Sequence, residues 1–524
     1  MRFFLLICLC VCFAPSVTAQ DVTYPAGFDE PFPLFSKALG PFTRTISTDS
    51  ERAQIYFNQG IQMMYAFTTV DAARSFREAQ KADSTCAICH WGEAWAWGSY
   101  LNGPMTAEAA PRAYAAIQKA LKKLSSANEV EKALIEAMSV RYVANFDPDT
   151  RAVQDSAYAK AMEAVADRFP HDLDAVTMYA EALFLLEPRR GNRDINDPDV
   201  MKLHEVLLRV LKQDIQHPGS CHLYIHATES TQDPGRAADC AEFLGNAIPG
   251  ASHINHMPSH TWNEIGRWGD GVRANIQAWH SDQKAAINEG FAIYPNHNLH
   301  MLLFAASMDG QGAIAVQAGR DYETLTGFNL YSALTLVRFG RFAEIDGLSG
   351  RSDNDIYGGM WDFAKGYAAL KKGDADFAKV YAGRVLTASD SSKASFRGHS
   401  AKHLLGTVGN ILMGEIHRSN GNSAEALKAF KLAAELEDQM AYDEPEPLPF
   451  AARHWLGAFQ LEQGAYVDAE ATYREELLDH PHNGWSLFGL LEALKGQKKT
   501  DAAIQADFDR SWARSDTWIR GSRF

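Results

Sequence analysis

Glycine, alanine and aromatic residues recur at fixed offsets along this chain, and this recurrence limits its fold more than any other feature. The clearest copies are Gly457, Gly464, Ala469 and Tyr473, followed by Pro481, and Gly414, Gly421, Ala426 and Phe430, followed by Ala433. Partial copies are Gly60, Ala72, Phe76 and Ala79 near the front, and Gly366, Gly373 and Ala378. A unit that returns in this way predicts stacked repeats, each of which buries its apolar face against its neighbours.

This pattern resembles the tetratricopeptide repeat family over about residues 50–500. The resemblance implies an all-α solenoid of helix-turn-helix repeats about 34 residues long, whose first helices line a concave groove. We expect a signal peptide over 1–19, an N-terminal arm over 20–48, N-terminal and central repeats over 49–345, and C-terminal repeats over 346–524. Three inserts rich in Pro, Gly, Asn or acidic residues should be loops: Glu187–Val200, Gly347–Asp355 and Asp438–Pro449.

The first residues indicate export. An apolar run from Phe3 to Ala14 follows Arg2, and the small residues that follow it fit cleavage after Ala19. No later segment reaches the 18 or more apolar residues typical of a membrane-spanning helix. We therefore expect a periplasmic or secreted protein without a transmembrane segment. The net charge of −15 argues against a nucleic-acid partner, which usually requires a basic face.

Histidines recur in register with the repeats. His222 and His226 are four residues apart, as are His256 and His260, so each pair shares one helix face. The two pairs are about 34 residues apart, which is one repeat. With Gly266 and Gly310 taken as mid-repeat glycines, His297 and His300 fall at the places of His253 and His256. The sequence predicts that seven histidines converge on one patch of the groove, within residues 217–300.

Imidazole is the commonest protein ligand for zinc, copper and iron, so this patch predicts a transition-metal site. The expected ligands are His222, His226, His256 and His260, while His253, His297 and His300 supply a second ion or outer ligands. Glu229, one turn after His226, would orient a ligand or move protons, and Glu264 is the other nearby carboxylate. A metal with an open position supports oxidation or hydrolysis of a small substrate.

Two alternatives to this hypothesis stay open. Groove histidines also suit a peptide or another polar ligand, which would make the chain a non-enzymatic interaction scaffold. The geometry of the metal site also depends on Pro258, which lies between His256 and His260 and should kink the helix or start it late.

The cysteines allow a third hypothesis. Cys86-Ala87-Ile88-Cys89-His90 matches the attachment signature of c-type haem, which would make the chain a monohaem electron-transfer protein with His90 as an axial ligand. The competing interpretation is a local disulfide or thiol pair between Cys86 and Cys89. Cys221 and Cys240 fall on the two helices of one repeat, where a disulfide would brace the helix that carries His222.

Overall fold

The protein is all-α. The computed structural model describes residues 22–188 and 191–524, so the predicted signal peptide lies outside the described residues. Within those ranges the only strands are β1 (Ser395–Phe396) and β2 (His399–Ser400), which form one short antiparallel pair. No helix in the described part of the chain is long and apolar enough to cross a membrane.

The helices follow one another along the chain with short connections. In the first part they are α1 (Glu51–Tyr65), α2 (Thr69–Ala82), α3 (Ala87–Ala96), α4 (Ala110–Lys122), η1 (Leu124–Ser126), α5 (Glu129–Ser139), η2 (Pro148–Thr150), α6 (Arg151–Arg168), α7 (Leu173–Phe184) and α8 (Pro198–Leu211). The central helices are α9 (Pro218–Thr228), η3 (Pro234–Ala237), α10 (Ala238–Leu244), α11 (Ser252–His256), α12 (Pro258–Glu264), α13 (Trp268–Ala285), α14 (Pro295–Met308), α15 (Gly312–Thr326), α16 (Leu330–Arg338) and α17 (Phe342–Ile345). The last helices are α18 (Asp355–Lys371), α19 (Ala375–Ser391), α20 (Ala401–Ser419), α21 (Ser423–Glu437), α22 (Arg453–Glu462), α23 (Tyr466–Asp479), α24 (Gly484–Gly496) and α25 (Ala502–Trp512).

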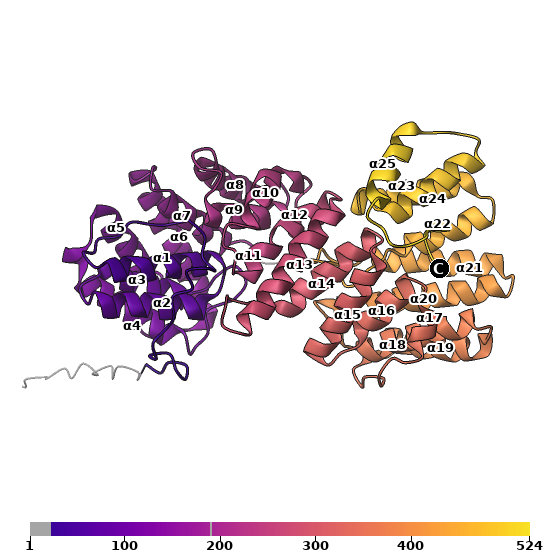
Figure 1. The fold of residues 1–524 in the computed structure, drawn as a ribbon, viewed down its shortest axis with the longest axis horizontal. Helices are drawn as coiled ribbons and strands as arrows, with labels where there is room; N and C mark the ends of the chain where they lie inside the picture. The colour runs from indigo at the N-terminus through magenta and orange to yellow at the C-terminus, as the bar shows by residue number, and fades with distance from the viewer. Residues whose placement is uncertain (1–21, 189–190) are drawn as a thin grey trace, which may run out of the picture.

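These helices stack as hairpins. Consecutive helices pack in pairs, and the first helices of successive hairpins also touch: α1 contacts α3, α7 contacts α9, α11 contacts α14, α18 contacts α20 and α22 contacts α24. The result is an elongated α-solenoid of tetratricopeptide-like repeats, which runs in order from the indigo N-terminal repeats to the yellow C-terminal ones (Figure 1). The fold class predicted from the residue offsets is confirmed.

Close packing explains the recurring residue types. In α20, a Cβ added to Gly414 would lie 2.5 Å from the ring of Phe430, and Gly92 in α3 meets Phe76 at the same distance. The later glycine of the unit has a different role, since Gly421 adopts φ +75° in the turn between the two helices. Glycine tolerates this left-handed conformation at no steric cost. The unit therefore combines a close helix contact, an aromatic residue that fills it, and a turn.

Replacing Gly414 by alanine should destabilise the fold, because the new methyl group would have to displace the Phe430 ring. Overpacking of this kind costs about 1–3 kcal/mol in the free energy of unfolding. The control is Gly383→Ala in α19, where nothing lies within 4 Å of the added Cβ and stability should rise by about 0.5–1 kcal/mol. Urea unfolding of both variants measures the difference, and equal stabilities would contradict the packing argument.

The C-terminal repeats curl back onto the central ones. The indole of Trp268 donates a hydrogen bond to the carbonyl of Pro481 at 2.9 Å, and the indole of Trp485 donates to the carbonyl of Ser307 at 2.8 Å. Residues 438–452, which link α21 to α22, are thereby brought over the first helices of the central repeats. This link is one of the three predicted loops, and it becomes part of the site described below.

The described residues of the other two inserts also form loops, except that α8 begins at Pro198 and α18 begins at Asp355. The buried apolar side chains form two large clusters. The first runs to Ile265 and also includes Phe291, and the second begins at Val272. The histidine-bearing helices lie at this junction. Our division of the repeats at residue 345 stays a prediction.

Candidate metal centre

Six of the seven predicted histidines gather in one cluster at the junction of the two cores. They come from first helices of consecutive repeats: α9 carries two, α11 carries two, and α12 and α14 carry one each. As expected, Pro258 interrupts the helix. α11 ends at His256 and α12 starts at Pro258, so His256 and His260 lie on separate segments, yet their rings are only 4.7 Å apart between centroids.

The cluster divides into two triads, and we call them the first and second triad. Within each, one side-chain nitrogen per histidine lies within 4.8 Å of the other two. The first triad is His222, His226 and His253, and the second is His256, His260 and His297. The triads adjoin each other, since the rings of His253 and His256 have centroids 5.0 Å apart and those of His226 and His260 are 5.2 Å apart.

This division differs from the expected one. His222, His226, His256 and His260 were predicted to share one ion, whereas the structure separates them two by two. His253 and His297, predicted to supply a second ion or outer ligands, lie as close to their neighbours as the other four. α11 ends at His256, and the ring of His253 on this helix packs 4.8 Å from that of His222 on α9, between centroids.

The spacing of the nitrogens suits a bound ion. Nε2 of His222 lies 3.1 Å from Nε2 of His253, and Nε2 of His256 lies 3.3 Å from Nε2 of His260. Two nitrogens bound to one ion at 2.0–2.1 Å are about 2.9–3.4 Å apart, depending on the angle between them. Nδ1 of His222 donates to the carbonyl of Tyr65 at 2.6 Å, which leaves its Nε2 with a lone pair directed at His253.

Glu229 joins the two triads. Its Oε1 accepts a hydrogen bond from Nδ1 of His226 at 2.9 Å, and its Oε2 pairs with Nδ1 of His260 at 2.5 Å. One carboxylate at the end of α9 thus orients one histidine of each triad through the ring nitrogen that faces away from the partner imidazoles. A carboxylate behind a histidine is the usual arrangement at metal sites, where it fixes the tautomer and the ring orientation.

Burial keeps most of these imidazoles neutral, which is the form that binds metals. It lowers the pKa of His222, His253, His256 and His297 below the ordinary histidine value. Burial alone would lower the pKa of His260 as well, but the carboxylate of Glu229 raises it to about 10. Nδ1 of His253 and Nδ1 of His256 are buried without a hydrogen-bond partner among the described residues. An all-nitrogen set of this kind fits a copper, zinc or iron ion.

Aromatic residues form the walls of the first triad. The ring of Phe67, just after α1, lies 4.3 Å from that of His222 and 5.2 Å from that of His253, between centroids. Tyr294, just before α14, packs edge-on against His253 at 5.7 Å. Phe67 and Tyr294 both have left-handed backbones, with φ of 60° and 61°. Such strain in bulky residues clusters at functional sites, where the surrounding fold imposes it.

A cavity of about 210 Å³ opens onto both triads. It is lined by Asn102, His226, His253, His260, Tyr294, Asn296, His297, Arg397 and Glu444. Glu444 comes from the 438–452 link and approaches Nδ1 of His260 at 3.3 Å, so it forms a third group of possible ligands with His226, Glu229 and His260. Residue spacing did not indicate this carboxylate, because it lies in an acidic loop far along the chain.

His300 lies outside both triads. Its Nε2 is 2.6 Å from the hydroxyl of Tyr331 and 3.1 Å from the carbonyl of Glu446. The seventh histidine therefore holds the 438–452 link against α14 and α16 instead of facing the cluster. Glu264, the other predicted carboxylate, lines a neighbouring cavity together with His260.

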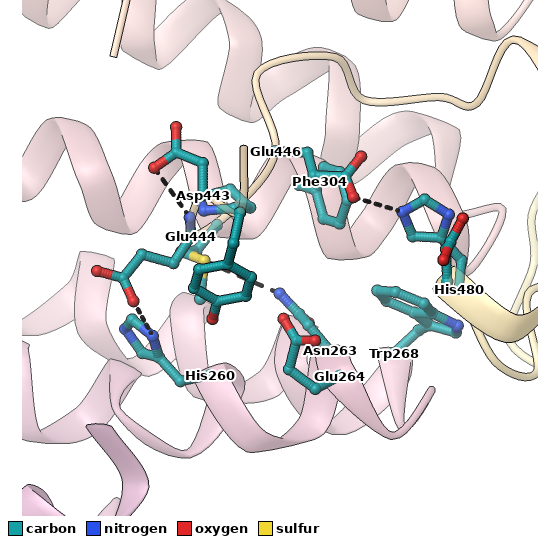
Figure 2. A pocket seen from close by; sticks show the side chains of 13 residues that line it. His260, Asn263, Glu264, Trp268, Phe304, Asp443, Glu444, Glu446 and His480 are labelled. Carbon is teal, nitrogen blue, oxygen red and sulfur yellow. Dashed lines mark hydrogen bonds and ion pairs between the residues drawn. The ribbon is translucent and has the colours of Figure 1, made fainter. Parts of the chain in front are cut away.

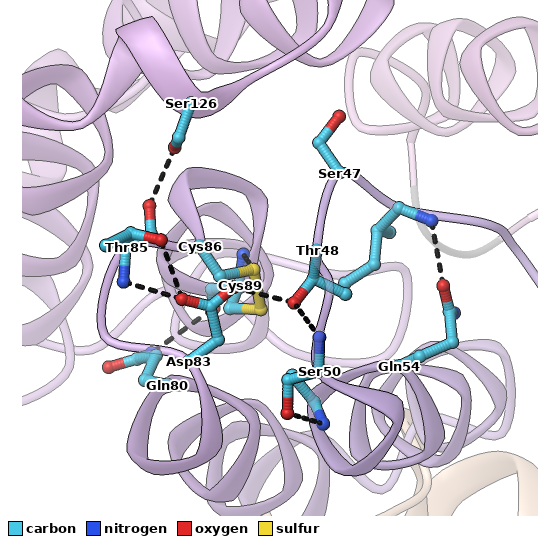
Figure 3. Close-up of a disulfide and its surroundings, with 12 residues drawn as sticks. Ser47, Thr48, Ser50, Gln54, Gln80, Asp83, Thr85, Cys86, Cys89 and Ser126 are labelled. Atoms are coloured by element: carbon cyan, nitrogen blue, oxygen red, sulfur yellow. Dashed lines mark hydrogen bonds between the residues drawn. A yellow bond between two sulfur atoms is a disulfide. The ribbon is translucent and has the colours of Figure 1, made fainter.

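The four cysteines of the described residues form two disulfides, Cys86–Cys89 and Cys221–Cys240. Figure 3 shows the first, beside Asp83 and Thr85 at the start of α3. Both of its sulfurs are consumed by the bond, and Cys86, Cys89 and Trp91 are fully or almost fully buried, so the residues do not fit a covalently attached haem. His90 is buried as well, and burial lowers its pKa to about 4. The disulfide is the interpretation that the structure supports.

Comparison with known proteins adds little beyond this geometry. No family model and no curated protein matches the chain. Among solved structures, yeast Tom70 is 11% identical and covers 88% of this chain and 97% of its own, with a TM-score of 0.33. A human IFIT1 dimer with PPP-AAAA is 10% identical over 89% and 92%, with a TM-score of 0.30, and the Cut9–Hcn1 heterotetramer of APC/C is 11% identical over 88% and 76%, with a TM-score of 0.29. These likenesses are too distant to say anything of the site, and the tetratricopeptide-like fold rests on the hairpins of the chain itself.

Proposed function

We propose that this chain is a secreted metalloprotein that holds two transition-metal ions, one in each histidine triad, and acts on a small substrate. The observation that carries the proposal is the pair of triads: six imidazoles from four helices, with nitrogens at the spacing of common ligands and with one carboxylate behind both sets. Simple hydrogen bonding between histidines does not require six rings in two sets of three.

The imidazole ligands favour copper, zinc or iron as the bound ion. Mg²⁺ and Ca²⁺ prefer oxygen ligands such as carboxylates and do not use all-nitrogen sites. Three protein ligands leave coordination positions open at each ion. Such ions supply Lewis acidity or, for copper and iron, electron transfer, which suits hydrolysis or oxidation. The cavity of about 210 Å³ beside the triads gives a small polar substrate access to them.

The surroundings support the same proposal. Two buried disulfides suit an oxidising compartment outside the cytoplasm. Glu229 and Glu444 face His260, and Glu229 holds both His226 and His260 in place for a ligand. The competing function is a non-enzymatic scaffold whose groove binds a peptide or a partner protein, and the experiment below separates the two.

The test is the metal content of the protein. Chelator-treated protein is reloaded with Cu²⁺, Zn²⁺ or Fe²⁺ in separate samples, desalted, and analysed by mass spectrometry of the elements. We expect two ions per chain. His222→Ala with His253→Ala should remove one ion, and His256→Ala with His297→Ala should remove the other. His171→Ala, an exposed histidine on the surface, is the control and should retain both. A wild-type protein that retains no ion with any of the three metals would end the proposal and favour the scaffold.

A further inference from the structure

A second cavity lies beside the histidine cluster and shares His260 and Glu444 with it. Its volume is about 70 Å³, and its walls come from α12, α13, α14, the 438–452 link and the end of α23. Figure 2 shows it from close by, with Glu264 and Asn263 on one wall, between His260 and Trp268, and with Glu446 and His480 on the other side. Nothing in the proposed metal centre uses this space.

Aromatic rings cover one side of the cavity. The rings of Trp268, Phe304 and His480 lie against one another, with centroids 6.0–6.2 Å apart. Trp262 and Trp485 elsewhere in the chain each carry an arginine over the ring. In the described part of the chain, no lysine or arginine lies over Trp268 or Phe304 in this way. The imidazole of His480 lies beside both rings, and Glu446 and Glu476 raise its pKa despite its burial. An aromatic face attracts a cation, and most strongly when water is excluded.

Carboxyl groups cover the other side, and they outnumber the basic side chains that line the cavity. Glu264, Glu446 and Asp479 line the cavity with His480, which already pairs with Glu476 at 2.9 Å and with Glu446 at 3.3 Å. Among the described ion pairs none includes Glu264 or Asp479. Burial, with the charge of Glu446, raises the pKa of Glu264 to about 8. A cation beside such a carboxyl group stabilises its ionised form and lowers its pKa.

We propose that this cavity binds the primary ammonium group of a small organic cation, with Glu264 and Glu446 facing the charge and Trp268 and Phe304 covering its carbon atoms. A hard metal ion is a poor occupant, because it needs about six oxygen ligands and the aromatic wall provides none. The volume of about 70 Å³ is several times the roughly 10–15 Å³ that one water molecule needs, so the cavity accommodates a group of a few non-hydrogen atoms. An ammonium group with a chain of three or four carbons has this size.

The probe is propylammonium chloride, titrated by calorimetry into the chelator-treated full-length protein at constant ionic strength. We expect saturable binding at one site, and affinity at least about tenfold higher than that of 1-propanol, which has the same size without the charge. Glu264→Gln should weaken propylammonium binding by about tenfold while circular dichroism stays unchanged. Phe304→Leu retains an apolar side chain but removes the aromatic ring, and it should weaken propylammonium binding by about threefold.

Glu435→Gln is the matched control, since Glu435 is an exposed carboxylate on α21. It should bind propylammonium like the wild type. Equal affinities for propylammonium and 1-propanol, unchanged affinity in Glu264→Gln, or no saturable binding at all would overturn the proposal. Because the titration uses metal-free protein, none of these outcomes bears on the two histidine triads, and loss of metal from the histidine variants leaves the ammonium pocket unaffected.

Discussion

Replacement of Glu229 by alanine is expected to weaken metal binding at both triads at once, although Glu229 is not itself one of the six imidazole ligands. Its two oxygens hold Nδ1 of His226 in the first triad and Nδ1 of His260 in the second. Loss of a carboxylate behind a ligating histidine usually costs about 10- to 100-fold in metal affinity. Here one substitution removes that support twice, so each of the two dissociation constants should rise by about this factor.

Competition between the protein and a chromophoric chelator for Cu²⁺ measures both constants. Glu229→Gln retains one oxygen that can accept a hydrogen bond from one of the two histidines, so it should restore one constant more than the other. Glu205→Ala, an exposed acidic residue on α8, is the control. The visible spectrum of bound Cu²⁺ provides a second readout, because a freed imidazole changes the ligand geometry, whereas a general loss of stability does not. A variant in which only one constant changes, or neither, would contradict the bridging role of Glu229.

The fold was predictable because the repeat unit is local. The contact of Gly414 with Phe430 and the turn at Gly421 lie within one hairpin, so their offsets in the sequence are also their relations in space. Aligning successive repeat units in the sequence then placed the histidines on the first helices of their repeats. This is why the gathering of His222, His226, His256 and His260 followed from spacing alone.

Two features of the site did not follow from spacing. The assignment of histidines to triads depends on how α11, α12 and α14 pack beside α9, whereas the sequence indicated only a break at Pro258. Glu444 reaches His260 only because the C-terminal repeats curl back, through contacts such as that between Trp268 and Pro481. Contacts between distant repeats depend on the small rotation of each repeat relative to the next, summed along the solenoid.

The N-terminal arm also makes contacts with a distant repeat that could not be predicted from the sequence. Its Arg44 pairs with Asp172 at 2.7 Å and with Asp174 at 2.8 Å, at the start of α7. Asp174 also accepts a hydrogen bond from the hydroxyl of Tyr65 and lies 3.3 Å from Nε2 of His217. Nothing in the sequence around Arg44 indicated this buried network. It matters for the site, because the carbonyl of Tyr65 is the group that orients His222.

Asp174→Asn should therefore be among the most destabilising single substitutions in the chain. Removing one partner of a buried ion pair costs about 3–5 kcal/mol, and the lower end applies here because Arg44 retains Asp172. Thermal and urea unfolding of the metal-free protein at neutral pH measure the loss, and Asp49→Ala, an exposed acidic residue, is the control. A loss below about 1 kcal/mol, the usual value of an exposed pair, would show that the network adds little.

The pH dependence of the free energy of unfolding separates the effect of the Asp174 charge from that of its packing. Burial alone would raise the pKa of Asp174, but Arg44, His217 and Tyr65 hold it well below its usual range. A carboxyl group whose pKa is lower in the folded protein contributes its full stability above its unfolded pKa of about 3.9 and loses it as the pH falls. The gap in unfolding free energy between wild type and Asp174→Asn should be constant from about pH 8 to 5 and should narrow below about pH 4. A gap that persists unchanged into the acid range would mean that Asp174 acts through shape, and that the link from the N-terminal arm through Tyr65 to His222 does not depend on its charge.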